Sequence, residues 1–354
     1  MTDKKIKVLI VEDTLVAQKL LKGIVQSDSR FELVAIAENG IQANEYVAKY
    51  KPDVVSMDII MPFMDGVVAT RKIMQDNPVP VVIVSSFYQS SEVDMAIKVL
   101  EAGAVTILPR PFGPGHSKFT QSANHYLNTL KLMSEVKVVR RRKDNLQRPI
   151  EKAYKSTSVI SNQIENNEFK ILVIGASAGG PQGLSSILSG IPSDFPLPVL
   201  IVQHIDSHFA EGFVTWLNSS SNLPVVLTKC DEKLKPGHVY LPVGDHHLIV
   251  KSSTVVSVVK ENTANTLRPS VDVLFKSVAE IFGKNTIAVL LSGMGKDGAA
   301  ELKNLYEKGA YTIAQDEASS LVFGMPGEAV KLGGVCKLLS PENIVKEIIN
   351  LIKI

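Results

Sequence analysis

The sequence predicts an α/β fold in two domains joined by a linker, and three observations support it. Short runs of Val, Ile and Leu alternate with amphipathic stretches along the chain, a pattern typical of parallel sheets covered by helices. A length of 354 residues fits two domains of ordinary size. Residues 137–168 are polar, basic at their start and poor in large apolar side chains. We therefore predict domains over residues 1–136 and 169–354, with 137–168 as the linker.

The first domain contains five apolar runs of strand length, each separated from the next by enough residues for a helix. Five strands connected in this way predict a small doubly wound domain with a parallel sheet. The predicted strands are Lys7–Val11, Leu33–Ala37, Val54–Met57, Val81–Val84 and Val105–Leu108.

Acidic residues follow two of these strands. Glu12 and Asp13 end the first strand, and Asp58 ends the third. The carboxyl ends of parallel strands share one edge of the sheet, so we expect three carboxylates in one pocket, where their repulsion calls for a cation such as Mg²⁺. Ser85 follows the fourth strand and Arg110 follows the fifth. A carboxylate free to accept a phosphoryl group, with a hydroxyl and a cation beside it, predicts a phosphoryl-aspartate site.

The layout over residues 5–135 resembles the flavodoxin-like receiver domains of bacterial two-component response regulators. Asp58-Ile59-Ile60-Met61-Pro62-Phe63-Met64-Asp65-Gly66 matches the D-x-x-M-P-x-M-D-G loop of that family. The resemblance implies phosphorylation at Asp58, Mg²⁺ binding by Glu12, Asp13, Asp58 and the Ile60 carbonyl, and a switch role for Ser85 and Arg110.

Two positions depart from the receiver pattern. Arg110 stands where the family has Lys, and the planar guanidinium does not freely replace a compact ammonium group. Ile107 stands where the family usually has an aromatic switch residue. Metal binding and phosphorylation are still expected, but we expect their coupling to the output domain to be weakened.

The linker begins with the basic run Lys137–Lys143. Its arginines are interpreted either as part of a solvated hinge or as a docking surface for a partner or for the other domain.

The second domain opens with an apolar run that breaks into small residues around Ser177. Gly175-Ala176-Ser177-Ala178-Gly179 satisfies G-x-S-x-G, a strand-to-helix turn that exposes a serine hydroxyl. His204 ends the apolar run that starts at Pro198, and Asp297 lies in the Gly-rich loop after Thr286–Ser292. Three such residues at one sheet edge predict a nucleophile, its base and an orienting acid.

Other interpretations of the serine motif exist. The same residues fit a plain strand–loop–helix junction, or a dinucleotide loop whose second glycine is replaced by Ser177. The chain order Ser, His, Asp also differs from the Ser, Asp, His order of α/β-hydrolases, so a different fold is expected. Ser270 precedes a helical segment and is either an N-cap or a direct contact of the catalytic site.

Residues from about Phe169 to Ile354 resemble the catalytic domain of the chemotaxis response regulator protein-glutamate methylesterases, which are also protein-glutamine glutaminases. The resemblance implies a doubly wound, mostly parallel sheet, a triad of Ser177, His204 and Asp297, and no cofactor in this domain. Ala178 replaces the usual Thr, and Ile205-Asp206 replaces Met-Pro after the base. The matching stretches are Ile174–Gly180, Gln203-His204, Arg268–Phe275, Gly293–Ala299, Ala314–Ser319 and Val322–Pro326.

The function expected from this resemblance is hydrolysis of methyl esters on glutamate side chains of methylated chemoreceptors, together with deamidation of receptor glutamines. Backbone N–H groups of Ala178 and Met294 are our prediction for the oxyanion hole. A chemotaxis histidine kinase is the expected phosphodonor. An esterase of a non-chemotaxis sensory pathway and a non-catalytic receptor-binding regulator are the alternatives.

Composition excludes several other classes. A net charge of +2 argues against a nucleic-acid binder, and no apolar run approaches the roughly 18 residues that a membrane span needs. Residues 1–5 lack the features of a secretory signal. Cys230 and Cys336 fit no metal or redox spacing and are predicted to be reduced, buried thiols. A cytoplasmic location is expected.

Overall fold

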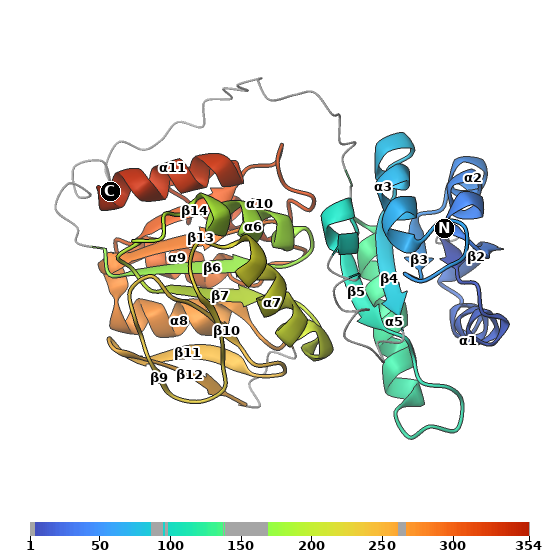
Figure 1. Ribbon diagram of the computed structural model, residues 1–354, viewed down its shortest axis with the longest axis horizontal. Coiled ribbons are helices and arrows are strands. Elements are labelled where there is room, and N and C mark those ends of the chain that lie inside the picture. Colours follow the sequence, from blue (N-terminus) through green and yellow to red (C-terminus); the bar gives the residue numbers. More distant parts are fainter. Residues whose placement is uncertain are drawn as a thin grey trace. The chain divides into compact units, whose positions relative to one another are not determined.

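A computed structural model describes residues 4–85, 98–136, 169–260 and 267–353, together with residues 95 and 138. The chain divides into two compact units, Met1–Lys143 and Asp144–Ile354, and each is described by itself (Figure 1). Except for residue 138, the predicted linker over 137–168 lies outside the described residues, as does the interpretation of its arginines.

The first unit is built on a five-stranded sheet in the order β2-β1-β3-β4-β5, and all of its strand pairs are parallel. This confirms the predicted doubly wound sheet, with strand ends that differ from the predicted ones by two residues at most. The strands are β1 (Ile6–Val11), β2 (Phe31–Ala37), β3 (Val54–Met57), β4 (Val81–Ser85) and β5 (Thr106–Pro109), and the helices are α1 (Leu15–Gln26), α2 (Gly40–Tyr50), α3 (Gly66–Asp76) and α5 (Phe119–Ser134).

The register of this sheet positions the acidic residues. β3 is buried throughout, and β1 is buried from Val8 onward, as expected for strands covered by helices on both faces. Val11 is paired with Met57. Glu12 and Asp58, which follow these two residues, therefore emerge side by side at the carboxyl edge of the sheet.

The second unit contains a seven-stranded sheet in the order β15-β14-β13-β6-β7-β10-β8, again parallel throughout. The predicted doubly wound α/β domain is confirmed. Its strands are β6 (Ile171–Ala176), β7 (Val199–Gln203), β8 (Val225–Thr228), β10 (Val239–Pro242), β13 (Thr286–Leu290), β14 (Tyr311–Gln315) and β15 (Lys337–Leu339), and its helices are α6 (Gly180–Gly190), η2 (Ser207–Phe209), α7 (Ala210–Ser220), α8 (Val271–Ile281), η3 (Gly283–Asn285), α9 (Ala299–Glu307), α10 (Met325–Leu332) and α11 (Pro341–Ile352).

Two cores lie on opposite faces of this sheet. Apolar residues of α6, α7 and α11 pack with one set of strand side chains, whereas those of α8, α9 and α10 pack with the other set. In Figure 1, α11 (red) and α8 (orange) accordingly lie on opposite sides of the sheet. Successive strand side chains point to opposite faces, so Leu172 and Ile174 belong to one core and Ile171 and Val173 to the other.

Two features differ from the sequence-based expectation. A separate three-stranded antiparallel sheet, in the order β11-β12-β9, is formed by β9 (Glu232–Lys233), β11 (His247–Ser252) and β12 (Val255–Val259). It arises because only two residues separate β11 from β12, which forces a hairpin. Cys230 is exposed and Cys336 is half-buried, so the prediction of two buried thiols was wrong.

Candidate functional site

Ser177 lies in the turn between strand β6 and helix α6, as the G-x-S-x-G pattern predicts. The left-handed residue of this turn is Gly179, with φ 75°, and Ser177 is not among the described non-glycine residues with positive φ. A Cβ at Gly179 would lie 2.4 Å from the Leu321 Cβ, closer than real Cβ contacts come. The glycine therefore takes the unusual conformation and leaves the Ser177 backbone unstrained.

His204 is placed beside Ser177 by the pairing of β6 with β7. Ala176 is paired with Gln203, and the His204 N–H donates to the Ala176 carbonyl at 2.9 Å. The Gln203 side-chain amide donates to the carbonyls of both Ser177 and His204, at 2.9 Å each. One buried amide thus holds the backbones of the two residues together.

Strand β13 flanks Ser177 on the other side and leads into the loop that carries Asp297. The Ser177 N–H donates to the Ser292 carbonyl at 3.0 Å. Beyond Ser292 the loop returns to the sheet edge, where Asp297 Oδ2 lies 2.8 Å from His204 Nε2. The structure therefore brings Ser177, His204 and Asp297 to one edge of the sheet. Because Nε2 faces Asp297, Nδ1 is the ring nitrogen that would have to take a proton from Ser177, and this role of His204 stays a prediction.

Asp297 is held by donors from helix α8 as well as by His204. Its carboxylate accepts the N–H groups of Val271 at 2.6 Å and Asp272 at 3.2 Å, and the Ser270 hydroxyl at 2.8 Å. Burial raises the pKa of Asp297, but the His204 bond and charge and the N–H and O–H donors outweigh it and lower the pKa to about 2. The carboxylate is therefore ionised at neutral pH, as an acceptor for the imidazole must be.

Of the two interpretations of Ser270, N-cap or direct contact of the site, the structure favours the contact. Ser270 occupies the N-cap position of α8, but its hydroxyl bonds Asp297 and makes no cap hydrogen bond. Asp297 itself accepts the first N–H groups of that helix. Sequence reasoning also missed Asp272, which contacts the loop after Asp297. The available signal was an acidic residue in the first turn of a predicted helix.

The two predicted oxyanion donors lie beside the serine. In the part of the chain that the structure describes, neither the Ala178 N–H nor the Met294 N–H donates a hydrogen bond. Neighbouring N–H groups are used, since Ser177 donates to Ser292 and Gly293 donates to Val322. Ala178 and Met294 therefore retain donors, while their role in the reaction stays a prediction.

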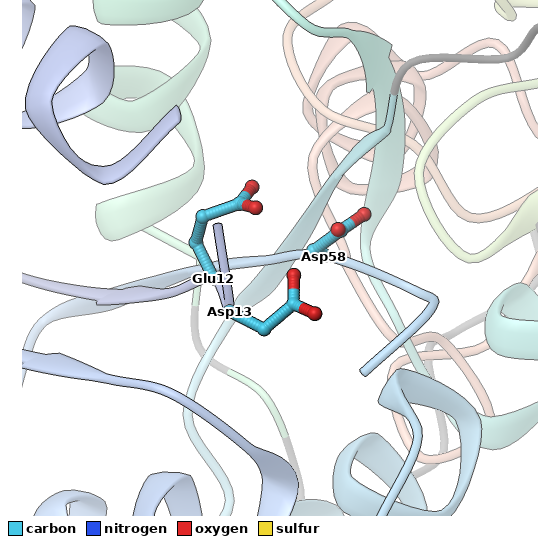
Figure 2. A group of neighbouring side chains, drawn as sticks. All are labelled: Glu12, Asp13 and Asp58. Carbon is cyan, nitrogen blue, oxygen red and sulfur yellow. The ribbon is translucent and has the colours of Figure 1, made fainter. Parts of the chain in front are cut away.

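The acidic pocket of the first unit has the predicted composition. Glu12, Asp13 and Asp58 each offer a carboxylate oxygen within 4.8 Å of the others, and Figure 2 shows the three side chains together at the ends of their strands. An all-oxygen donor set of this kind suits Mg²⁺. Burial, followed by the Asp58 charge, raises the pKa of Glu12 to about 7, although Arg110 acts in the opposite direction. The pocket thus carries more negative charge than its protein cation offsets.

Arg110 forms a bridge within this pocket. One guanidinium nitrogen lies 2.8 Å from Glu12 Oε2 and 3.1 Å from Asp58 Oδ2. The arginine therefore holds two of the three carboxylates that are predicted to bind Mg²⁺. Ser85 is buried at the end of β4, and Ile107 is buried in β5, so both lie at the positions that the sequence predicted.

In the first unit, a pocket of about 500 Å³ is lined by residues at the ends of α2 and α3 and just after them, among them Val47, Lys51, Asp76 and Val79. Beside the second site, a pocket of about 10 Å³ is lined mainly by apolar residues that include Ile205, which replaces the usual Met after the base. Within the described residues, no helix is both long enough and apolar enough to cross a membrane.

Comparisons with known proteins match each of the two units with a different family model. A family model described as CheB methylesterase matches residues 172–348. A second model, described as response regulator receiver domain, matches residues 8–118. The first match spans the serine, histidine and aspartate of the second unit, and the second spans the acidic pocket and Arg110.

Relatives of full length match as well. A protein of Geobacter metallireducens called protein-glutamate methylesterase/protein-glutamine glutaminase 4 is 46% identical, over 98% of this chain and 99% of its own length. A relative in Hahella chejuensis with the same activity name is 44% identical, over 95% and 96% of the two chains. The crystal structure of the Thermotoga maritima CheB methylesterase catalytic domain is 38% identical, with a TM-score of 0.50, over 52% of this chain and 98% of that chain.

Proposed function

The chain belongs to the CheB methylesterase family, with a response regulator receiver domain ahead of the esterase domain, and we propose that it is a receiver-regulated serine hydrolase of protein-glutamate methyl esters. The observation that carries the proposal is the 2.8 Å bond between His204 Nε2 and Asp297 Oδ2 at the sheet edge where Ser177 emerges.

The reaction begins at Ser177. His204 Nδ1 takes the Ser177 proton as Oγ attacks the ester carbonyl carbon, and Asp297 stabilises the imidazolium that forms. The Oγ–C bond forms, the C–OCH₃ bond breaks, and the imidazolium returns its proton to the methoxy oxygen, so that methanol leaves. The N–H groups of Ala178 and Met294 would stabilise the oxyanion.

The second half of the reaction regenerates the enzyme. His204 takes a proton from water as the water oxygen attacks the acyl carbon. The C–Oγ bond then breaks, and the imidazolium returns its proton to Ser177 Oγ, which gives free glutamate, the Ser177 hydroxyl and neutral His204. A glutamine amide differs from the ester mainly in its leaving group, so the same site would release ammonia from glutamine. We propose methylated chemoreceptors in the cytoplasm as the substrate, which is what the family resemblance implies.

The receiver domain supplies regulation in this proposal. Asp58 would accept a phosphoryl group from a chemotaxis histidine kinase, and Ser85 and Arg110 would contact it. Glu12, Asp13, Asp58 and the Ile60 carbonyl would hold Mg²⁺, which neutralises charge on the phosphoryl oxygens when bound. Arg110 is already bonded to Glu12 and Asp58, so phosphorylation must rearrange an existing ion pair.

The test is methanol release from methylated chemoreceptor by the full chain, with and without a small phosphodonor. Release that depends on Ser177 and increases with phosphodonor would support the proposal. A methanol-release rate that does not change with phosphodonor would contradict the regulatory part of the proposal. Receptor binding without methanol release would favour a non-catalytic regulator instead, and release only from receptors of another sensory system would change the assigned pathway.

A further inference from the structure

Helices α8 and α9 of the second unit begin next to each other and exchange carboxylates. Asp297, just before α9, accepts the N–H groups of Val271 and Asp272 at the start of α8. Asp272, in the first turn of α8, accepts the N–H of Gly298, just before α9, at 2.9 Å. The first N–H groups of a helix lack partners within it and favour negative charge. Each helix therefore receives its capping carboxylate from the other.

Neither helix provides this cap for itself. The residue before α8 is Ser270, whose hydroxyl bonds Asp297. The residue before α9 is Gly298, with φ 82°, where a Cβ would lie 2.5 Å from Val271 Cγ1. A residue with a capping side chain does not fit there. The packing of the two helices thus leaves the start of each helix to be capped by a side chain from outside that helix.

The exchange holds Asp297 both through its side chain and through the peptide group that follows it. The Asp297 carboxylate is held by α8, and the peptide that follows Asp297 is held by Asp272 through the Gly298 N–H. Asp297 Oδ2 contacts both His204 Nε2 and the Val271 N–H. A shift of the loop would therefore change the histidine contact directly, and small errors in such geometry reduce rates strongly.

This arrangement has an electrostatic cost. Burial and the nearby Asp297 charge raise the pKa of Asp272 to about 6. A helix N-terminus needs no second buried carboxylate, because Asn or Ser serves as a cap without the repulsion.

From this geometry we propose that Asp272 is a positioning residue of the hydrolase, which acts on the reaction through Asp297 by holding the Gly298 N–H and with it the loop that presents Asp297 to His204. The proposal rests on the serine hydrolase function proposed above. It assigns Asp272 no contact with the substrate.

The experiment is a double-mutant cycle in the full chain. Asp272→Ala should lower kcat for methanol release by about 10–100-fold with KM within about twofold, because it removes the acceptor that fixes the loop. Asp272→Asn keeps an acceptor oxygen and should recover most of that loss. In an Asp297→Ala background, Asp272→Ala should cost less than about twofold, because its effect passes through Asp297.

The matched control is Glu307→Ala, which removes an exposed acidic residue from the last turn of α9, where the carboxylate pairs with Lys303 of the same helix. It should leave kcat unchanged. Thermal unfolding distinguishes a variant that has lost its fold from a folded variant whose Asp297 loop has shifted. If the Ala variant unfolds, the Asn variant still tests the proposal.

Three results would overturn the proposal: an unchanged kcat in folded Asp272→Ala, an Asn variant as slow as the Ala variant, or an equal loss in the Asp297→Ala background. Labelling of Ser177 by a fluorophosphonate provides a second measure of serine reactivity. Wild-type protein that is labelled at Ser177 but releases no methanol would refute the proposed substrate, while the labelling rates of the variants would still test Asp272.

Discussion

The two units both place carboxylates at the carboxyl edge of a parallel sheet, but they hold them with different donors. In the receiver unit, Glu12 and Asp58 are bridged by a single long side chain, that of Arg110. In the esterase unit, Asp297 is held by two backbone N–H groups, the Ser270 hydroxyl and His204.

This difference explains what each site can do. A side-chain cation can swing away and be replaced by another cation, so a pocket built on Arg110 can change state. Backbone donors at a helix start cannot leave without unfolding the turn, so Asp297 keeps one orientation. The comparison predicts that the Asp297 site of the esterase unit keeps one geometry and is regulated by the Arg110 pocket of the receiver unit, which can change its ion pairs.

The largest expected effect tests the fixed site. Ser177→Ala should reduce methanol release by about 10⁴-fold or more, because the nucleophile is lost while the fold remains. Substitution of His204 or Asp297 in the Ser177→Ala background should reduce the rate little further, because the three residues act as one unit.

The control for Ser177→Ala is Ser189→Ala, on the exposed side of helix α6, where the hydroxyl donates to the Ser186 carbonyl of its own helix. Its rate should equal that of the wild type. Retention of activity within tenfold in Ser177→Ala would exclude the serine mechanism, and additive losses in double mutants would mean that the wrong residues have been paired.

Acid titration tests whether Asp297 is locked by its donors. Its folded-state pKa is about 2, below its ordinary value near 3.8, so its contribution to stability is present above pH 4 and is lost as the pH falls toward 2. The loss should be about 1–2 kcal/mol after allowance for solvent screening and for Asp272.

Urea unfolding of the wild type and of Asp297→Asn between pH 2.5 and 5 measures this loss. Trp216 is the only tryptophan and lies in α7 of the second unit, so its fluorescence reports that unit alone. The stability difference between the two proteins should shrink as the pH falls. A difference that is constant with pH would show that the carboxylate is not stabilised as proposed.

Removal of the receiver unit tests whether it inhibits the esterase unit. Deletion of residues 1 to about 165 should raise methanol release several-fold, because the unphosphorylated receiver is expected to inhibit the esterase. Circular dichroism of the fragment checks its fold. A folded fragment no faster than the full chain would mean that the receiver does not inhibit this enzyme.

The smallest effect concerns Arg110. Because Arg110 bridges Glu12 and Asp58, we expect phosphodonor to activate the full chain only modestly, and Arg110→Lys should enlarge the activation ratio about two- to threefold. The ratio compares methanol-release rates with and without phosphodonor. Arg71→Lys, at an exposed position of α3, is the matched control.

Calorimetric titration with Mg²⁺ gives this last comparison a readout that is independent of activity. Mg²⁺ should bind Arg110→Lys more tightly, because the shorter, flexible and strongly hydrated ammonium group is expected to hold Glu12 and Asp58 less firmly than the guanidinium nitrogen that bridges them. A wild-type activation ratio of many tens that does not grow in Arg110→Lys would show that this receiver has adapted to arginine.

The sequence by itself was enough for the framework. Apolar runs predicted both parallel sheets because a strand buried on both faces has to be apolar throughout. The shared edge followed from them, since residues directly after parallel strands of one sheet emerge at the same edge, whereas strand order and register came from the structure. That shared edge is why Ser177 and His204, and likewise Glu12 and Asp58, could be assigned to one site before any coordinates were known.

Only the tertiary structure decided which donors hold each carboxylate. The exchange between Asp297 and Asp272 depends on how closely α8 and α9 begin, which no local pattern encodes. The same packing decided between the two interpretations of Ser270, whose hydroxyl contacts Asp297. The Arg110 bridge depends on the reach of one long side chain from β5 to β1 and β3. Strands follow from repeating local chemistry, whereas these contacts join residues 25 or more positions apart through side-chain packing.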